Sequence, residues 1–193
     1  MLSGVIAGCG APAEEETYRQ VSVGQMTLSI PADWESGAEY FEESVKAGSE
    51  DLKKVVTIDG YHNEPTKTIL GCMVMDMRSL FELQDMSWEG WKSALKAQYL
   101  TKEQYATLTA TALMGKCEEL TREVHRELII NDNEAYESHY KCNWEGDEPM
   151  RINWLIIFAE EDCGVVVMFV HEAKWEKVEE TWGKIRDSVQ FSP

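Results

Sequence analysis

The sequence predicts an α+β domain in which an antiparallel sheet is layered with helices. Four segments with the length of strands follow one another between residues 121 and 170, and short polar turns separate them. A strictly alternating segment at 26–30 precedes them, and an amphipathic segment at 173–189 follows them. Consecutive strands that are then covered by helices are typical of the α+β class.

The first expected strand lies in "GQMTLSIPADW". Met26, Leu28 and Ile30 alternate with polar neighbours, which is the period of a strand with one buried face. Pro31 ends this strand because proline cannot donate to the hydrogen-bond ladder. The segment 35–65 has a weaker pattern, in which "VVTI" is a candidate for a short strand.

The next expected strand is "TILGCMVMDMR", followed by a helix. Ser87 is suited to cap the N-terminus of that helix, and Glu89 places an acid in the first turn, where the helix dipole favours negative charge. Gly90 is a poor helix former. Apolar residues at helical spacing extend the helix to about residue 100: Trp88, Trp91, Leu95 and Tyr99. The threonine-rich segment 101–115 is a candidate for a second helix.

The clearest pattern is an antiparallel meander in the second half of the chain. "TREVHRELII" and "EAYESHYKC" flank "NDN", whose Asn and Asp residues favour a tight turn. "WEGDEP" then leads into "MRINWLIIFA", and "EEDCG" leads into "VVVMFV". The final helix, "AKWEKVEETWGKIRDSV", presents one apolar stripe to the core, formed by Trp175, Val178, Trp182, Ile185 and Val189.

Three of these features together resemble the PsbP-like family: the opening "MTLSIPADW", the "INDNEAYESHY" hairpin and the terminal helix ending in "IRDSVQF". The resemblance extends over most of residues 21–191, and 35–65 and 101–118 do not map clearly onto it. It implies an α/β/α sandwich with a central antiparallel sheet. The family includes many bacterial lipoproteins of unknown function, and the resemblance implies no catalytic residues.

The N-terminus contains "IAGC", which resembles the bacterial lipobox, in which an aliphatic residue and two small residues precede a cysteine. In proteins with that motif the cysteine thiol receives diacylglycerol, and the chain is cut just before it. The resemblance implies that 1–8 are a signal remnant and that 9–20 comprise a lipidated Cys9 and a flexible acidic tether. A single domain then spans 21–193.

A complete export signal begins with a basic region, whereas no Lys or Arg precedes Cys9. We therefore expect that the sequence is clipped or that Met1 is not the natural start. The alternative is an ordinary N-terminus with a stray cysteine. After residue 9 no stretch approaches the ~18 consecutive apolar residues of a membrane-spanning helix. The lipobox resemblance implies that the contact with the membrane is a lipid on Cys9, on the extracytoplasmic face.

The formal net charge of −17 excludes some classes of partner. Nucleic acid would be repelled, because affinity for it depends on neutralising phosphates with basic groups. Binding of a basic patch to an anionic lipid surface is disfavoured for the same reason. A cationic partner or ligand is compatible with this charge, and so is a simple solvated acidic surface.

Four cysteines other than Cys9 allow three pairings: Cys72, Cys117, Cys142 and Cys163. Cys142 and Cys163 form the first pair to test, because both lie near expected strand ends. The alternative is that all four are free, partly buried thiols. The sequence has no CxxC pair, so zinc-ribbon and thioredoxin-type interpretations lack support.

Two groups of residues are candidates for a metal site. Met73, Met75 and Met77 would lie on one face of a strand, and thioethers favour Cu(I). Methionine is also a common core filler, and core packing is the expected role. His125 and His139 could lie opposite each other across the "NDN" hairpin and permit a surface metal site, although a solvated pair is the simpler expectation.

No catalytic motif is present in the sequence. "HEAKW" at His171 lacks the second histidine of a zinc protease, so we expect a polar junction between a strand and a helix there. The GxSxG elbow, the Walker A loop and GxGxxG are also absent. Trp34 and Trp144 lie near expected loops, where exposed aromatic rings could form a binding surface.

These observations favour a lipid-anchored, extracytoplasmic binding or assembly module without a cofactor, whose protein partner or small ligand is unknown. The competing hypotheses are an enzyme whose site has no recognisable motif and a metal carrier that uses Met or His.

Overall fold

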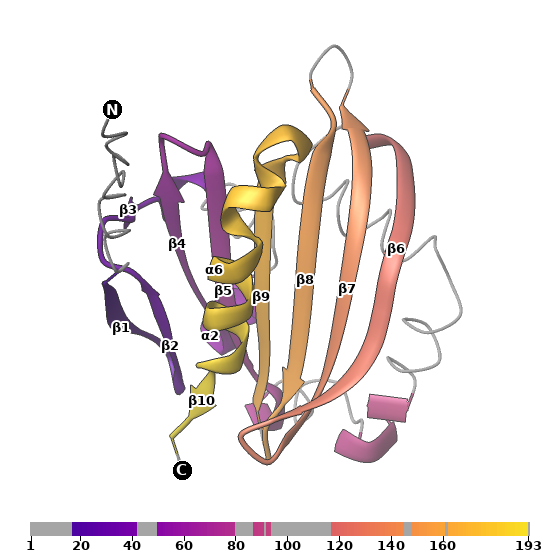
Figure 1. Ribbon diagram of the computed structural model, residues 1–193. Helices are drawn as coiled ribbons and strands as arrows, with labels where there is room; N and C mark the ends of the chain where they lie inside the picture. Colours follow the sequence, from indigo (N-terminus) through magenta and orange to yellow (C-terminus); the bar gives the residue numbers. More distant parts are fainter. Residues whose placement is uncertain are drawn as a thin grey trace, which may run out of the picture.

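The computed structural model describes residues 17–41, 50–79, 87–90, 92–93, 117–144, 148–160 and 162–192. These residues form a seven-stranded sheet in the order β3-β4-β5-β9-β8-β7-β6 and a three-stranded sheet in the order β1-β2-β10. All strand pairs are antiparallel. The helix α6 lies across one face of the large sheet, in front of β5 and β9 in Figure 1.

The strands are β1 (Tyr18–Val23), β2 (Met26–Pro31), β3 (Glu35–Ser36), β4 (Val56–Asn63), β5 (Thr68–Asp76), β6 (Cys117–Ile130), β7 (Asn133–Trp144), β8 (Met150–Phe158), β9 (Asp162–His171) and β10 (Gln190–Phe191). The helices include α2 (Glu50–Val55) and α6 (Trp175–Asp187), and a short 3-10 helix, η1 (Glu172–Lys174), precedes α6.

The α+β prediction is confirmed, including the four-strand meander, which is the β6–β7–β8–β9 part of the large sheet. The predicted "NDN" turn joins β6 to β7 with Ile130 paired to Asn133. Asn131 and Asp132 have φ values of 47° and 68°. Positive φ at both central residues is what a two-residue hairpin turn of type I′ requires, and Asn and Asp tolerate it better than most residues.

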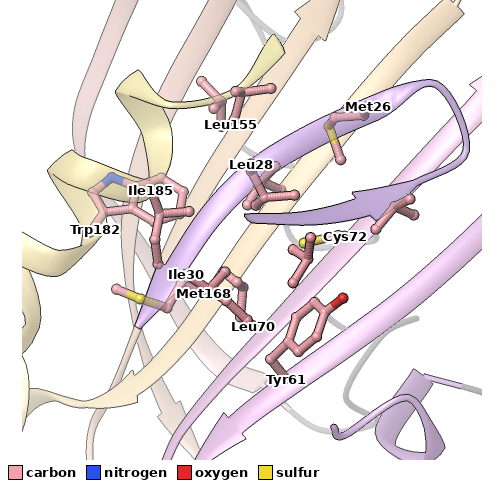
Figure 2. Close-up of a cluster of buried hydrophobic side chains, with 14 of the residues drawn as sticks. Met26, Leu28, Ile30, Tyr61, Leu70, Cys72, Leu155, Met168, Trp182 and Ile185 are labelled. Carbon is pink, nitrogen blue, oxygen red and sulfur yellow. The ribbon is translucent and has the colours of Figure 1, made fainter. Parts of the chain in front are cut away.

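The face of the large sheet that carries α6 holds the first core. The predicted stripe of α6 is buried there, as are the alternating apolar residues of β2. Figure 2 shows this cluster, in which Trp182 and Ile185 of α6 approach Leu28 and Ile30 of β2. The small sheet therefore packs on the same face as α6, because its apolar side and the helix stripe share one core.

The opposite face of the large sheet holds a second core, built from β5, β7, β8 and β9. Phe41 is buried in this core, beside two glycines that face each other on β4 and β5. A Cβ atom at Gly60 or Gly71 would lie 2.7 Å or 2.6 Å from the Phe41 ring. The paired glycines thus leave the space that this ring fills.

Two strands differ from the sequence-based expectation. The strand β1 was not predicted and begins at Tyr18, so residues 18–20 belong to the small sheet and not to the tether. Only Val21 and Val23 of β1 are buried, which is too few positions for a clear alternation. The "VVTI" strand is longer than expected, because β4 continues through Gly60 and Tyr61 to Asn63.

The expected helix start at Ser87 is confirmed: residues 88–90 are helical, and the Gly90 amide donates to the Ser87 hydroxyl over 3.1 Å. The end of that helix, at 94–100, and the candidate helix at 101–115 lie outside the described residues. So do Cys9 and the signal remnant.

Candidate functional site

The described residues form an open cavity of about 350 Å³ where hairpin turns gather at one end of the sheet. Four separate parts of the chain line it: Gln25, Asn133, Ala159, Glu160, Asp162, Phe191 and Ser192. The β6–β7 turn and β10 lie at this end, the lower end in Figure 1. Turns held by a rigid sheet are where binding residues concentrate, and small-ligand sites have volumes of about 300–1,000 Å³. We call this feature the turn-end cavity.

Backbone hydrogen bonds fix the walls of the turn-end cavity. The Ala159 amide donates to the Asp162 carbonyl over 3.0 Å and closes the β8–β9 turn. The Ser192 amide donates to the Gln25 carbonyl over 3.0 Å and ties the chain after β10 to the β1–β2 turn. These bonds hold polar side chains from distant parts of the sequence around one space.

The aromatic wall of the cavity depends on a glycine. A Cβ atom at Gly164 would lie 2.6 Å from Cζ of Phe191 and 3.0 Å from Sδ of Met26. Gly164 on β9 therefore gives the Phe191 ring room to pack at the base of the small sheet. The ring is half-buried, so one part packs on the core and the rest contributes to the cavity.

The chemistry of the cavity favours a cation. Two of the lining residues, Glu160 and Asp162, are acidic, and none of the described residues that line the cavity is basic. Carboxylates bind ammonium and guanidinium groups by charge-assisted hydrogen bonds, and an aromatic face attracts the same cations. The arrangement is therefore suited to a basic group that enters from solvent.

A second polar cluster lies beneath α6 around Glu137, which is fully buried. Its carboxylate accepts hydrogen bonds from Arg126 Nε at 2.6 Å, from Trp182 Nε1 at 2.6 Å and from Arg186 Nη1 at 3.2 Å, and it lies 2.8 Å from His139 Nε2. Burial raises the pKa of Glu137, but the hydrogen bonds from His139, Arg126 and Trp182 outweigh it and lower the pKa to about 2. This ionised carboxylate joins α6 to β6 and β7.

A third polar group lies at the other end of the meander and depends on an irregularity in β6. The pairing register of β6 shifts at Glu123, which has no partner in the β7 ladder. The Glu123 carboxylate contacts Lys141 Nζ at 2.9 Å and Arg151 Nη2 at 3.0 Å. Arg151 also makes a bidentate pair with Glu172, whose pKa is lowered by hydrogen bonds from Arg151 and Lys141. Both Arg151 and Lys141 are thus neutralised within the fold.

The predicted methionine group belongs to the second core. Met73 and Met75 share one face of β5, as expected, and pack against that core. Met77 lies just after β5 and is fully buried. The three side chains contribute to packing, which is the role that the sequence favoured.

The predicted proximity of His125 and His139 is wrong. His125 is paired with Ser138, and His139 is paired with Val124, so the two histidines project from opposite faces of the sheet. His139 contacts the Trp175 ring of α6, whereas His125 Nδ1 lies 2.8 Å from Ser138 Oγ. Among the described residues, no group of three or more His, Cys, Asp or Glu side chains is arranged to hold a metal ion.

The suggested Cys142–Cys163 pair is also wrong. Cys142 is disulfide-bonded, whereas Cys72 and Cys163 are free and buried. Cys142 is paired with Met150, and Cys163 is paired with Phe158. These partners occupy opposite ends of β8, so both cysteines lie near strand ends, but about 26 Å apart at ~3.3 Å per residue.

Other singled-out residues are placed as follows. His171 ends β9, and η1 connects it to α6, which confirms the polar junction between a strand and a helix. Trp34 is buried and so contributes no exposed aromatic surface. The side chains of Trp91 and Trp144 lie outside the described part of the structure, as does Cys9.

Comparison with solved structures identifies the architecture. The chain superposes on the solution structure of the cyanobacterial PsbP protein, CyanoP, from Synechocystis sp. PCC 6803 with a TM-score of 0.61 and 13% identity, covering 98% of this chain and 100% of that chain. The chain has a PsbP-like fold. A mutant of the protein Mog1 superposes on this PsbP-like chain with a TM-score of 0.50 and 10% identity, covering 91% and 96%. No protein-family model matches the sequence, and no curated protein matches it.

Proposed function

We propose that this PsbP-like protein is a lipid-anchored, extracytoplasmic binding or assembly module that holds a basic group of a partner protein in the turn-end cavity. The observation that carries the proposal is the cavity itself. It brings Glu160 and Asp162 of the β8–β9 turn together with the Phe191 ring of β10, with no basic residue among its described lining residues. The net charge of −17 adds a long-range attraction for a basic partner.

Two observations support the extracytoplasmic, anchored location. The "IAGC" segment provides a cysteine in the context of a lipobox. Cys142 is disulfide-bonded, and structural disulfides form and persist mainly in oxidising compartments outside the cytosol. Among the described residues, no helix is long and apolar enough to cross a membrane.

The free cysteines among the described residues are not suited to covalent catalysis. Burial raises the pKa of the Cys72 and Cys163 thiols. The thiolate is the nucleophilic form of cysteine, so neither side chain is activated for nucleophilic chemistry. Glu137 is equally unsuited to donate a proton at neutral pH, because its pKa lies near 2.

The binding proposal is tested by cross-linking the protein to its partners in the membrane fraction and measuring how much of each partner is captured. The full-length protein is compared with the double variant Glu160→Gln, Asp162→Asn and with the control Glu176→Gln, Glu180→Gln, which removes the same charge from the exposed face of α6. We expect the wild type and the control to recover the same basic partner, and the cavity variant to recover about tenfold less. Equal recovery by all three proteins would overturn the proposal.

A further inference from the structure

We infer that the disulfide partner of Cys142 is Cys117, so that a covalent bond joins the first residue of β6 to β7. The Cys142 side chain has no surface exposed to solvent. Cys142 is fully buried, packed in the second core. A residue without exposed surface cannot reach a cysteine of another molecule, so its partner belongs to the same chain.

The cysteine content of the chain limits the possible partners of Cys142. The chain contains five cysteines, and Cys72 and Cys163 are free. Cys9 and Cys117 remain as partners for Cys142. The proposed function assigns the sulfur of Cys9 to a lipid thioether, and the elimination of Cys9 rests on that proposal.

The backbone register of the β6–β7 hairpin relates Cys117 to Cys142. Cys117 is paired with Trp144, and Trp144 lies two residues from Cys142 on β7, so Cys117 and Cys142 occupy the same face as diagonal neighbours. Diagonal neighbours in a regular ladder are about 7–8 Å apart, slightly beyond the usual Cα separation in a disulfide. The register of β6 shifts between Cys117 and Glu119, and such an irregularity bends the strand locally. Because this irregularity lies next to Cys117, the separation of a regular ladder does not apply there.

The bond has a mechanical consequence. β6 is the last strand of the large sheet and pairs with β7 alone among the described strands. The "NDN" turn joins the two strands at one end, and the disulfide would join them at the other. In the oxidation, the two thiols lose two protons and two electrons, and a protein disulfide of an extracytoplasmic thiol oxidase accepts them and becomes a dithiol.

Peptide mapping of the full-length protein under non-reducing conditions, after alkylation of free thiols, tests the inference. We expect a peptide containing Cys117 linked to one containing Cys142, with alkylated Cys72 and Cys163. An alkylated Cys142, or its linkage to any other cysteine, would overturn the inference. Because the wild type alone decides the result, a misfolded variant cannot obscure it.

The outcomes also separate this inference from the proposed function. A Cys117–Cys142 peptide without lipid on Cys9 supports the disulfide and contradicts the anchor. Lipidated Cys9 with an alkylated Cys142 supports the anchor and overturns the disulfide. A Cys9–Cys142 peptide contradicts both. As a second readout, we expect reduction to lower the denaturant midpoint of the wild type and to leave that of the Cys117→Ser, Cys142→Ser variant unchanged.

Discussion

Glu137 shows how a single residue can connect a helix to a sheet. A fully buried carboxylate is unfavourable unless hydrogen bonds and opposite charges compensate it. Here Arg126 of β6 and Arg186 of α6 supply the charge, and Trp182 supplies a further donor. The alternation of "EAYESHYKC" predicts a strand, but it does not reveal that a glutamate in that strand is buried, because its partners come from two other elements.

Replacing Glu137 by Gln should destabilise the protein by roughly 2–4 kcal/mol, because two guanidinium groups lose their buried counter-charge. The control Glu180→Gln removes an exposed pair with Lys184 and should change the free energy of unfolding by no more than about 0.5 kcal/mol. Urea unfolding at pH 7 measures both. Similar effects of the two substitutions would show that the Glu137 cluster is not a stabilising contact.

The same residue predicts a pH dependence. The pKa of Glu137 falls from 4.5 to about 2 on folding, so the unfolded state binds this proton more readily. The stabilisation is complete above pH 4.5 and is lost as the pH falls through 2. Its full size is on the order of 3 kcal/mol. Unfolding free energies between pH 5 and 2 should fall less steeply for Glu137→Gln than for the wild type; parallel curves would contradict the assignment.

Gly71 sets the packing of Phe41. An added Cβ would meet the ring at 2.6 Å, so Gly71→Ala should destabilise the protein by about 1–3 kcal/mol. Gly183 in α6 is a matched control, because an added Cβ meets nothing within 4 Å and alanine is the better helix former. We expect Gly183→Ala to stabilise by about 0.5–1 kcal/mol. Thermal unfolding measures both, and a neutral Gly71→Ala would show that the Phe41 site can relax.

At the scale of the element, the β6–β7 hairpin combines a local and a distant constraint. Asn131 has positive φ, and its side-chain amide donates to the Val189 carbonyl over 2.7 Å. Asn131→Gly retains the backbone conformation and loses only this bond, which costs about 1 kcal/mol. Asn131→Ala also adds about 1 kcal/mol of left-handed strain. Chemical denaturation should therefore rank Asn above Gly above Ala, and a more stable Ala variant would contradict the turn geometry.

The elements differ in how well their local pattern predicts them. The alternation of β2, the "NDN" turn and the stripe of α6 predict those elements because each buries one regular face. The strand β1 escapes prediction because only Val21 and Val23 are buried. The turn-end cavity escapes it for another reason: Gln25, Glu160 and Phe191 have no shared spacing, and only the topology brings them together.

At the scale of the whole molecule, the positions of the histidines and cysteines show that the sequence alone does not predict which of these residues lie close together. His125 and His139 flank one turn, yet a register offset of one residue sends them to opposite faces. Cys142 and Cys163 both lie near strand ends, yet these are opposite ends of the sheet. Proximity in an antiparallel sheet depends on exact register, which sequence periodicity does not determine.

The PsbP-like domain itself offers a cavity with two carboxylates at one end and a first strand that begins at Tyr18, nine residues after Cys9. A tether of that length, at most about 3.5 Å per residue, would keep Tyr18, where the domain begins, within ~30 Å of the bilayer surface. A lipid on Cys9 would therefore restrict the search for partners to proteins at or near the membrane.

The most direct measurement is metabolic labelling of the source cells with a clickable fatty acid while they express the full-length gene. The wild-type protein should carry the label, and Cys9→Ala should lose it completely while its total abundance remains measurable by immunoblot. Absence of label from the wild type, or equal labelling of the two proteins, would contradict a lipid-anchored binding module.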